Sequence, residues 1–474
     1  MLSIPEPLGH DKPKSKFERL WDQIPRGNGF FRRRVEKFDG EYMIAFSPTE
    51  YVLRDIGSST TDFTPEMLLS HFVEFVRDEM SESGHDLISR YPGPPHVSAR
   101  ETALLSDVMK YIEDAEQYFV YGQFMKDLRR RSPTEDRLGN FVFNVLCNEI
   151  IGNEANKRHL DLKSFVRKIE ADEHEQKRLL FVFLGLPFKD QNPLRTDAPP
   201  SHVDFAEIGL LIQLHIQALA FHQDHPFGTD FVVLSDGKLY SRVFGVEWAA
   251  ADTYVSRVRE MRNRLNLQAS VHVIDLEECI LKLPEREVEQ FDHVKNLMKK
   301  LLSDSEILGS DNRLQSSFES LKRGMRRNIN TRETLKTLEW HEQVQLIGGV
   351  NLQTGGRLKA IARDLDERCT QAALEYASTN VALRVFRVVE RVFPDAIRAT
   401  VHPKVGQVAI PRSGSAYPWN GIGVWAPAKG FPKAIECREF GELSRLNRAW
   451  CAGYFPGDSY PAYYRTVEAA QVTG

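Results

Sequence analysis

An uninterrupted apolar run near the middle of the chain constrains the fold more than any other feature. The run LLFVFLGLPF covers residues 179–188 and follows the basic pair Lys177-Arg178. Its length and the bulk of its side chains are typical of a strand that is buried on both faces, as in a parallel sheet. We therefore expect a central sheet, mostly parallel, that is flanked by helices.

The segments after this run alternate between helix and strand. In chain order they are an apolar helix beginning at Phe205 with Asp204 as its N-cap, a strand DFVVLS, a helix over 249–265 and a strand SVHVIDL at 270–276. The Asp236-Gly237 pair predicts a tight turn after the strand DFVVLS, followed by a second short extended piece, GKLY. This alternation predicts an α/β layer.

The flanking regions have a different character. TPEMLLSHFVEFVRDEM keeps a helical period with Thr64 as its N-cap, and we expect further helices over 98–130 and 134–153. Residues 282–345 also look helical. The remaining expected elements are helices over 357–377 and 380–392, two extended segments AIRATVHP and GQVAIPR with a turn between them, and a late strand near GIGVW. The tail beyond it is not assigned to any element.

The length of the chain predicts more than one structural unit. At roughly 150 residues per domain, 474 residues correspond to about three units. We expect a mostly helical N-terminal extension over 1–135, an α/β domain over 136–430 and a C-terminal extension over 431–474.

Composition excludes several classes of protein. The 62 basic and 66 acidic residues give a net charge of -4, which argues against a dedicated nucleic-acid binder. The five cysteines are scattered and form no Cys-x-x-Cys pair, which argues against a disulfide scaffold or zinc ribbon and fits a reducing compartment. Neither a secretory signal nor an apolar stretch of the ~20 residues needed to span a bilayer is apparent. We expect a cytoplasmic protein that binds no membrane and no metal.

Three segments carry the polar residues of interest. The first, FKDQNPLRT, directly follows the buried run and supplies the cations Lys189 and Arg195 in a loop restrained by proline. Ligands of α/β folds gather at the carboxyl ends of strands, and two cations suit a phosphate or a carboxylate. A plain solvated loop is the alternative.

The second segment is Ser235-Asp236-Gly237, again at the end of a strand, and a simple turn would also explain it. In the third segment, residues 398, 400, 402 and 404 would share one face of a strand. That face would carry Arg398, Thr400, His402 and Lys404, a set that suits a site or a solvated surface but not a core. The neighbouring cations Arg398 and Lys404 would disfavour the protonated form of His402. A neutral imidazole can accept a proton, as a general base must.

These segments, in their order and spacing, resemble the pyoverdine/dityrosine biosynthesis family of isocyanide (isonitrile) synthases. The family typically shows PxFKxxNxxK after a buried strand, then SDG, then FPdxxRxSxHP, and finally Pro-Trp. This chain has LPFKDQNPLRT, LSDGKLY, FPDAIRATVHP and YPWNG, over roughly residues 140–430. It departs from the family at Arg195, where Lys is usual, at Thr400, where Ser is commoner, and at Asn420, where His is expected.

The resemblance implies a Rossmann-like catalytic domain and an activity. Ribulose 5-phosphate would donate one carbon to the amine of an amino acid, commonly tyrosine or tryptophan, without a metal or organic cofactor. A downstream oxygenase of the same secondary-metabolite pathway is a further partner that the resemblance suggests.

The resemblance also suggests roles for individual residues. The expected catalytic residues are His402, Asp236 and Lys189, with His402 moving protons and Asp236 orienting a base or accepting sugar hydroxyls. Lys189 and Arg195 would hold the sugar phosphate, and Arg398 a second anion. The other expected substrate-binding residues are Asn192, Ser235, Lys404 and Trp419.

Two alternatives stay open. The Asn420 departure motivates an enzyme on the same scaffold that delivers a formyl group or another sugar-phosphate fragment to an amine. The other alternative is a non-catalytic protein that binds a sugar phosphate.

Overall fold

The computed structural model describes most of the central part of the chain and shorter pieces toward its ends. The described residues are 63–80, 97–118, 162–190, 192, 196–222, 225, 227–348, 356–400, 407–409, 421–425, 433–435 and 450–466.

The central sheet has the parallel order that the apolar run predicts. Its strands are β2 (Leu179–Leu184), β3 (Thr229–Ser235), β4 (Val271–Asp275), β5 (Ile397–Thr400) and β6 (Val408–Ala409). Their order is β4-β3-β2-β5-β6, and every neighbouring pair is parallel. The chain moves outward from β2 to β3 and β4, then returns on the other side of β2 with β5. The strand order therefore reverses between β2 and β5, where α/β folds place their ligands.

Alternation of side chains along the strands builds two separate cores. Phe181 and Phe183 of β2 face one side, and Val182 faces the other. The Phe181 ring stacks on that of Phe231 with centroids 4.8 Å apart. Helices α9 (Phe205–His222) and α11 (Trp248–Arg264) cover this first face and bury their apolar residues against it.

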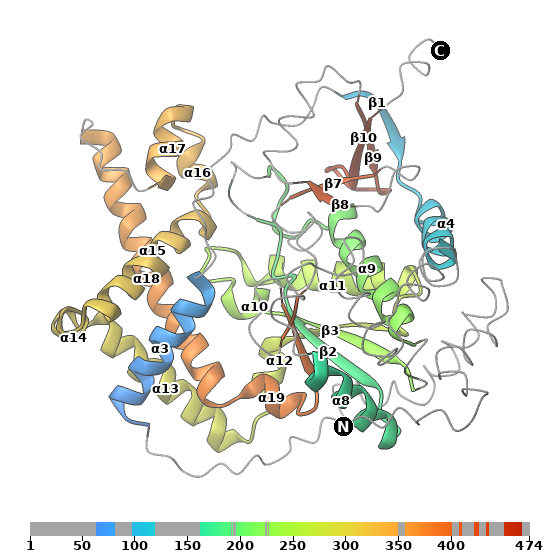
Figure 1. The fold of residues 1–474 in the computed structure, drawn as a ribbon. Helices are drawn as coiled ribbons and strands as arrows, with labels where there is room; N and C mark the ends of the chain where they lie inside the picture. The colour runs from blue at the N-terminus through green and yellow to red at the C-terminus, as the bar shows by residue number, and fades with distance from the viewer. Residues whose placement is uncertain are drawn as a thin grey trace.

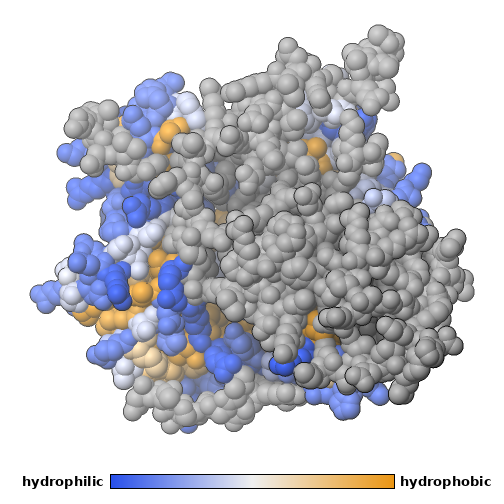
Figure 2. All heavy atoms as spheres, viewed as in Figure 1, coloured by the Kyte–Doolittle hydropathy of each residue, from blue (hydrophilic) through white to orange (hydrophobic). Residues whose placement is uncertain are grey.

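A thick helical layer covers the second face (Figure 1). It includes α3 (Pro65–Met80), α13 (Glu285–Ser303), α15 (Asn312–Asn328) and α18 (Gly356–Val385). Figure 2 shows hydrophobic side chains among polar ones on the side where Figure 1 places α3 and α13. The three layers confirm the predicted α/β fold class.

The remaining helices are short or peripheral. They are α4 (Leu105–Glu116), α8 (Leu162–His174), α10 (Gly237–Tyr240), α12 (Leu276–Leu281), α14 (Ser305–Ser310), α16 (Arg332–Leu335), α17 (Trp340–Gly348) and α19 (Val388–Val392). None of the helices in the described part of the chain combines the length and the apolar character that a bilayer crossing requires.

A second, mixed sheet was not anticipated from the sequence. Its strands are β1 (Val97–Thr102), β7 (Ile422–Val424), β8 (Lys433–Ile435), β9 (Trp450–Tyr454) and β10 (Tyr463–Thr466), in the order β1-β9-β10-β7-β8. Parallel pairing of β1 with β9 joins segments more than 300 residues apart in the chain. An ion pair reinforces the junction, with Arg465 Nε donating to Glu101 Oε1 at 2.6 Å.

Several local predictions need correction. Residues 98–102 lie in β1 rather than in a helix, because they pair with β9, and the helix begins only at Leu105. GKLY forms helix α10 instead of an extended piece. The two helices expected between 357 and 392 are instead one long helix, α18, followed by the short α19. The predicted domain boundaries stay a prediction, although β10 of the C-terminal segment pairs with β7 across the boundary at 430.

Candidate active site

The loops that leave β2 and β3 are fastened to each other at the carboxyl edge of the sheet. The Ser235 hydroxyl, fully buried, donates to the Leu186 carbonyl at 2.8 Å. At Gly237, a Cβ atom would lie 1.6 Å from the Pro187 carbonyl oxygen, so only glycine fits this close approach. Two of the three residues of the SDG segment therefore hold the loop that carries Lys189.

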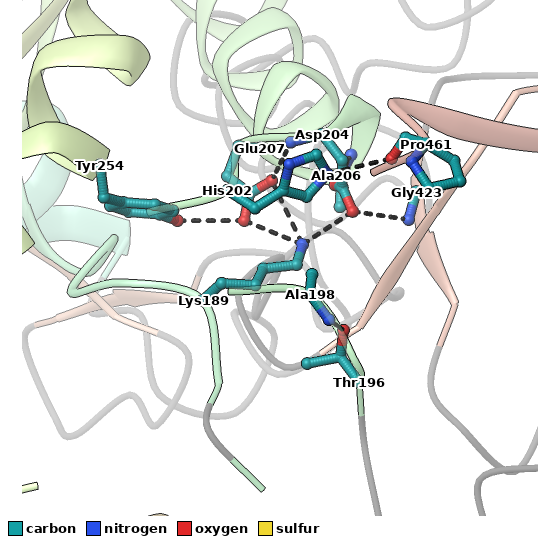
Figure 3. A network of polar contacts seen from close by, with 10 residues as sticks. All are labelled: Lys189, Thr196, Ala198, His202, Asp204, Ala206, Glu207, Tyr254, Gly423 and Pro461. Atoms are coloured by element: carbon teal, nitrogen blue, oxygen red, sulfur yellow. Dashed lines mark hydrogen bonds and ion pairs between the residues drawn. The ribbon is translucent and has the colours of Figure 1, made fainter. Parts of the chain in front are cut away.

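Lys189 ends in a buried cluster of charged groups (Figure 3). Its ammonium nitrogen lies 2.9 Å from Asp204 Oδ2 and 3.1 Å from Glu207 Oε1. The side chains of Lys189 and Glu207 have no exposed surface, and that of Asp204 is buried. Removing these charges from water is tolerable only because they are paired and hydrogen-bonded.

Asp204 precedes α9 as its N-cap and Glu207 lies in the first turn, and together they form a capping box. The backbone N–H of Ala206 donates to Asp204 Oδ1 at 2.8 Å, and the backbone N–H of Asp204 donates to Glu207 Oε2 at 2.9 Å. This reciprocal pattern satisfies two N–H groups at the start of the helix. The same residues therefore cap α9 and bind Lys189.

Three further elements contact the cluster. From α11, the Tyr254 hydroxyl donates to Glu207 Oε1 at 3.0 Å. From β7, the Gly423 N–H donates to Asp204 Oδ2 at 3.1 Å. The C-terminal segment is attached beside it, since His202 Nε2 lies 3.0 Å from the Pro461 carbonyl oxygen. The cluster thus ties both sheets and two helices together.

One lysine between two buried carboxylates leaves one of them protonated at neutral pH. Burial raises the pKa of Glu207 to about 8, and the charge of Asp204 adds to this although Lys189 opposes it. Burial acts to raise the pKa of Asp204, but the charge of Lys189, the hydrogen bond to Glu207 and the nearby His202 together outweigh it, and the pKa lies below its usual value. The two carboxylates raise the pKa of Lys189 despite its burial. With Glu207 protonated, the charges of Lys189 and Asp204 balance each other.

The other predicted site residues are dispersed. Asn192 is buried, and its side-chain amide donates to the Arg327 carbonyl at 3.1 Å. Asp236 follows β3, and its carbonyl accepts from the Tyr240 N–H at 3.1 Å. Arg398 pairs with Val182 in the sheet, so its side chain points to the helical layer and away from α9. Arg195, His402, Lys404 and Trp419, like Asn420, lie outside the described residues.

The partners of Lys189 were missed at the sequence level. Asp204 was recognised only as a helix cap, and His202, Glu207 and Tyr254 were not singled out. The available sequence pattern was Asp-x-x-Glu at 204–207, a capping-box spacing, after a loop that contains a lysine. In the described part of the chain, no three His, Cys, Asp or Glu side chains converge so that they could hold a metal ion.

Comparisons with known proteins add the family context. A family model described as "Pyoverdine/dityrosine biosynthesis protein" matches residues 169–425, more than half of the chain. Among solved structures, the PvcA protein from Pseudomonas aeruginosa is similar at 19% sequence identity and a TM-score of 0.44. That match covers 72% of this chain and 96% of the other. A search of curated proteins gave no match.

Proposed function

This chain belongs to the pyoverdine/dityrosine biosynthesis family, and on that premise we propose that it is an isonitrile synthase. Its substrates would be ribulose 5-phosphate and an α-amino acid of the tyrosine or tryptophan type. The amine would condense with the C2 ketone of the sugar and release water. Eliminations and cleavage of carbon–carbon bonds would then leave C2 on nitrogen as the isonitrile carbon.

One observation carries the proposal from the structural side. The Lys189 cluster lies at the carboxyl edge of the sheet, on the loop that leaves β2 beside the reversal of strand order. Imine formation and elimination both require protons to move near neutral pH, and buried groups with shifted pKa values are typical of sites that do so. The protonated carboxyl of Glu207 is such a group.

We assign Lys189 a positioning role instead of direct contact with the phosphate. Its ammonium is fully buried and contacts both Asp204 and Glu207, so a phosphate would have to displace the buried ion pair with Asp204 and the contact with Glu207 to reach it. The cluster instead fixes the loop after β2 and the start of α9, and its Glu207 carboxyl is protonated at neutral pH.

Proton transfer to and from the substrate is proposed for His402. Strand β5 ends at Thr400, two residues before His402 in the sequence, and β5 flanks the reversal of strand order. Asp236 would orient a base or accept sugar hydroxyls, and Lys404 and Trp419 would contact substrate. Arg195 and Arg398 would hold the anionic groups.

The experiment that tests the function is a product analysis. Purified protein, ribulose 5-phosphate and a pool of the common amino acids are incubated at neutral pH and analysed by mass spectrometry. An isonitrile gains one carbon and loses two hydrogens relative to the amino acid, whereas a formamide gains carbon and oxygen. Formamide as the first product would favour the formyl-transfer alternative that Asn420 motivates. Absence of any product, combined with thermal stabilisation by ribulose 5-phosphate, would favour a binding protein.

A further inference from the structure

The loop that joins β2 to α9 forms neither a helix nor a strand in its described residues. Its internal hydrogen bonds include that of the Lys189 N–H to the Pro200 carbonyl, at 2.9 Å, and that of the Thr196 N–H to the Asn192 carbonyl, at 3.2 Å. A loop of this kind is held in place by contacts with the elements around it. The Lys189 cluster supplies such contacts on the side of α9.

One arginine of the helical layer binds three consecutive carbonyl groups of this loop. Arg332 is the first residue of α16, whose Leu335 packs in the core of the helical layer. Its Nη1 donates to the Asp197 carbonyl at 2.8 Å, and its Nη2 donates to the carbonyls of Thr196 at 3.3 Å and Ala198 at 2.9 Å. A guanidinium holds its donors in a rigid planar fork, so it fixes these carbonyls more precisely than an ammonium could. Its charge also strengthens each bond.

A second contact joins the loop to the same part of the helical layer. The side-chain amide of Asn192, a buried residue, donates to the carbonyl of Arg327 at 3.1 Å. Arg327 lies in the last turn of α15, and we call residues 327–332, which lead from this turn to Arg332, the α15–α16 corner. The corner therefore binds the loop at two places, one before and one after residues 193–195 in the sequence.

The α15–α16 corner is itself well anchored. The backbone N–H of Asn330 donates to the Phe244 carbonyl at 2.7 Å, and its side-chain amide donates to the Gly245 carbonyl at 3.1 Å. Arg368 of α18 donates to the Asn330 carbonyl. These bonds tie the corner to the segment between α10 and α11 and to α18. An anchor that is held in this way can restrict the motion of a loop that it binds.

We propose that Arg332 is a positioning residue, which holds the loop after β2 so that Arg195 can bind the phosphate of the sugar phosphate. The inference rests on the proposed function, because that function gives Arg195 its role. Arg195 directly precedes Thr196, the first residue whose carbonyl Arg332 binds. Arg332 itself does not contact the substrate. A mobile loop loses binding energy when a ligand orders it, so a loop that is already anchored binds the same ligand more tightly.

The first part of the test measures the loop by hydrogen exchange and mass spectrometry, and it requires no turnover. It compares R332M, R332K and a control, R259M, which removes the bond from Arg259 to the Val273 carbonyl between α11 and β4. The N–H groups of Thr196 and Ala198 are hydrogen-bonded within the loop. We expect R332M to speed their exchange by about 10-fold or more, the effect of losing a hydrogen bond to a charged donor. R332K should fall between R332M and the wild type, and R259M should match the wild type in this segment.

The second part measures kinetics. R332M should raise the KM for ribulose 5-phosphate by about 10-fold with less effect on kcat, because the variant weakens binding through the loop and leaves the groups that move protons in place. R259M should not change the KM.

Equal exchange of the loop in R332M and the wild type would overturn the proposal, and so would faster exchange with an unchanged KM. Similar changes in R332M and R259M would indicate a general loss of stability and would also contradict it. If the wild type forms no isonitrile, the proposed function fails, and the exchange rates alone then decide whether Arg332 holds the loop.

Discussion

The ammonium of Lys189 lies 2.9 Å from Asp204 Oδ2, although the two residues stand at opposite ends of the loop that joins β2 to α9. The ion pair closes that loop, and Glu207 and Tyr254 complete its surroundings. The loop, the start of α9 and the neighbouring strand β7 are therefore held by one buried group of charges. Four predictions follow from this arrangement and from the proposed chemistry.

Replacing Lys189 by Met should strongly destabilise the fold. The substitution leaves two buried carboxyl groups without their cation, and breaking a buried ion pair in this way costs about 3–5 kcal/mol. The free energy of unfolding in urea measures the effect. The control is Lys177→Met, because Lys177 is about 42% exposed and pairs only at the surface, where we expect a change within about 0.5 kcal/mol. Similar losses in the two variants would contradict the role of the cluster.

The protonated state of Glu207 predicts a specific pH dependence of stability. Its pKa is about 8 in the folded protein and ordinarily near 4.5, so the folded state binds the extra proton between these values. The stability that this proton contributes is complete below pH 4.5 and declines as the pH rises toward 8.

Glu207→Gln removes that titration and keeps a neutral side chain. We expect the wild type to lose more unfolding free energy than Glu207→Gln when the pH is raised from 6 to 9. All other titrating groups are common to both proteins, so the difference reports the titration of Glu207 together with its effect on Lys189, Asp204 and Tyr254. Parallel stability curves would show that this carboxyl is already ionised at pH 6.

Turnover should depend on His402 without a comparable effect on binding. We expect His402→Ala to lower kcat by roughly 10²- to 10⁴-fold, the usual contribution of a general acid or base. The thermal shift caused by ribulose 5-phosphate should persist. His341→Ala is the matched control, because His341 is an exposed residue of α17. Unchanged turnover would remove His402 from the mechanism.

Gly237 should not tolerate even an alanine. A Cβ atom there would lie 1.6 Å from the Pro187 carbonyl oxygen, so the loop after β2 must shift. We expect Gly237→Ala to cost more than about 2 kcal/mol of unfolding free energy. Gly309→Ala in helix α14 meets no atom within 4 Å and should be neutral or stabilising by up to about 1 kcal/mol. Equal stability of the two variants would contradict the observed packing of the loops.

The central α/β layer could be predicted because each of its helices and strands is indicated by a pattern of neighbouring residues in the sequence. The apolar run of β2, the Asp204 cap of α9 and the strand SVHVIDL each carry their pattern within a few residues. The second sheet could not be predicted in the same way. β1 reads VSARET and is mostly exposed, so nothing in it indicates a partner, and that partner lies near the other end of the chain.

The candidate site was predicted only in part, for a related reason. The loop with Lys189 could be found because it directly follows a buried strand. Its partners Asp204 and Glu207 were hidden because helix capping already explains an Asp-x-x-Glu pattern. Tyr254 reaches the cluster through the packing of α11 on α9, which no local pattern encodes. Ser235 could be located from the sequence, but its bond to the Leu186 carbonyl depends on how two loops meet.

The measurement that tests the central claim most directly follows one carbon atom. Ribulose 5-phosphate labelled with heavy carbon at C2 is incubated with the protein and the amino acid pool at neutral pH. A parallel sample carries the label at C1. The account predicts a labelled isonitrile from the C2 sample and an unlabelled one from the C1 sample. Label from C1 in the product, or label only in a formamide, would contradict it.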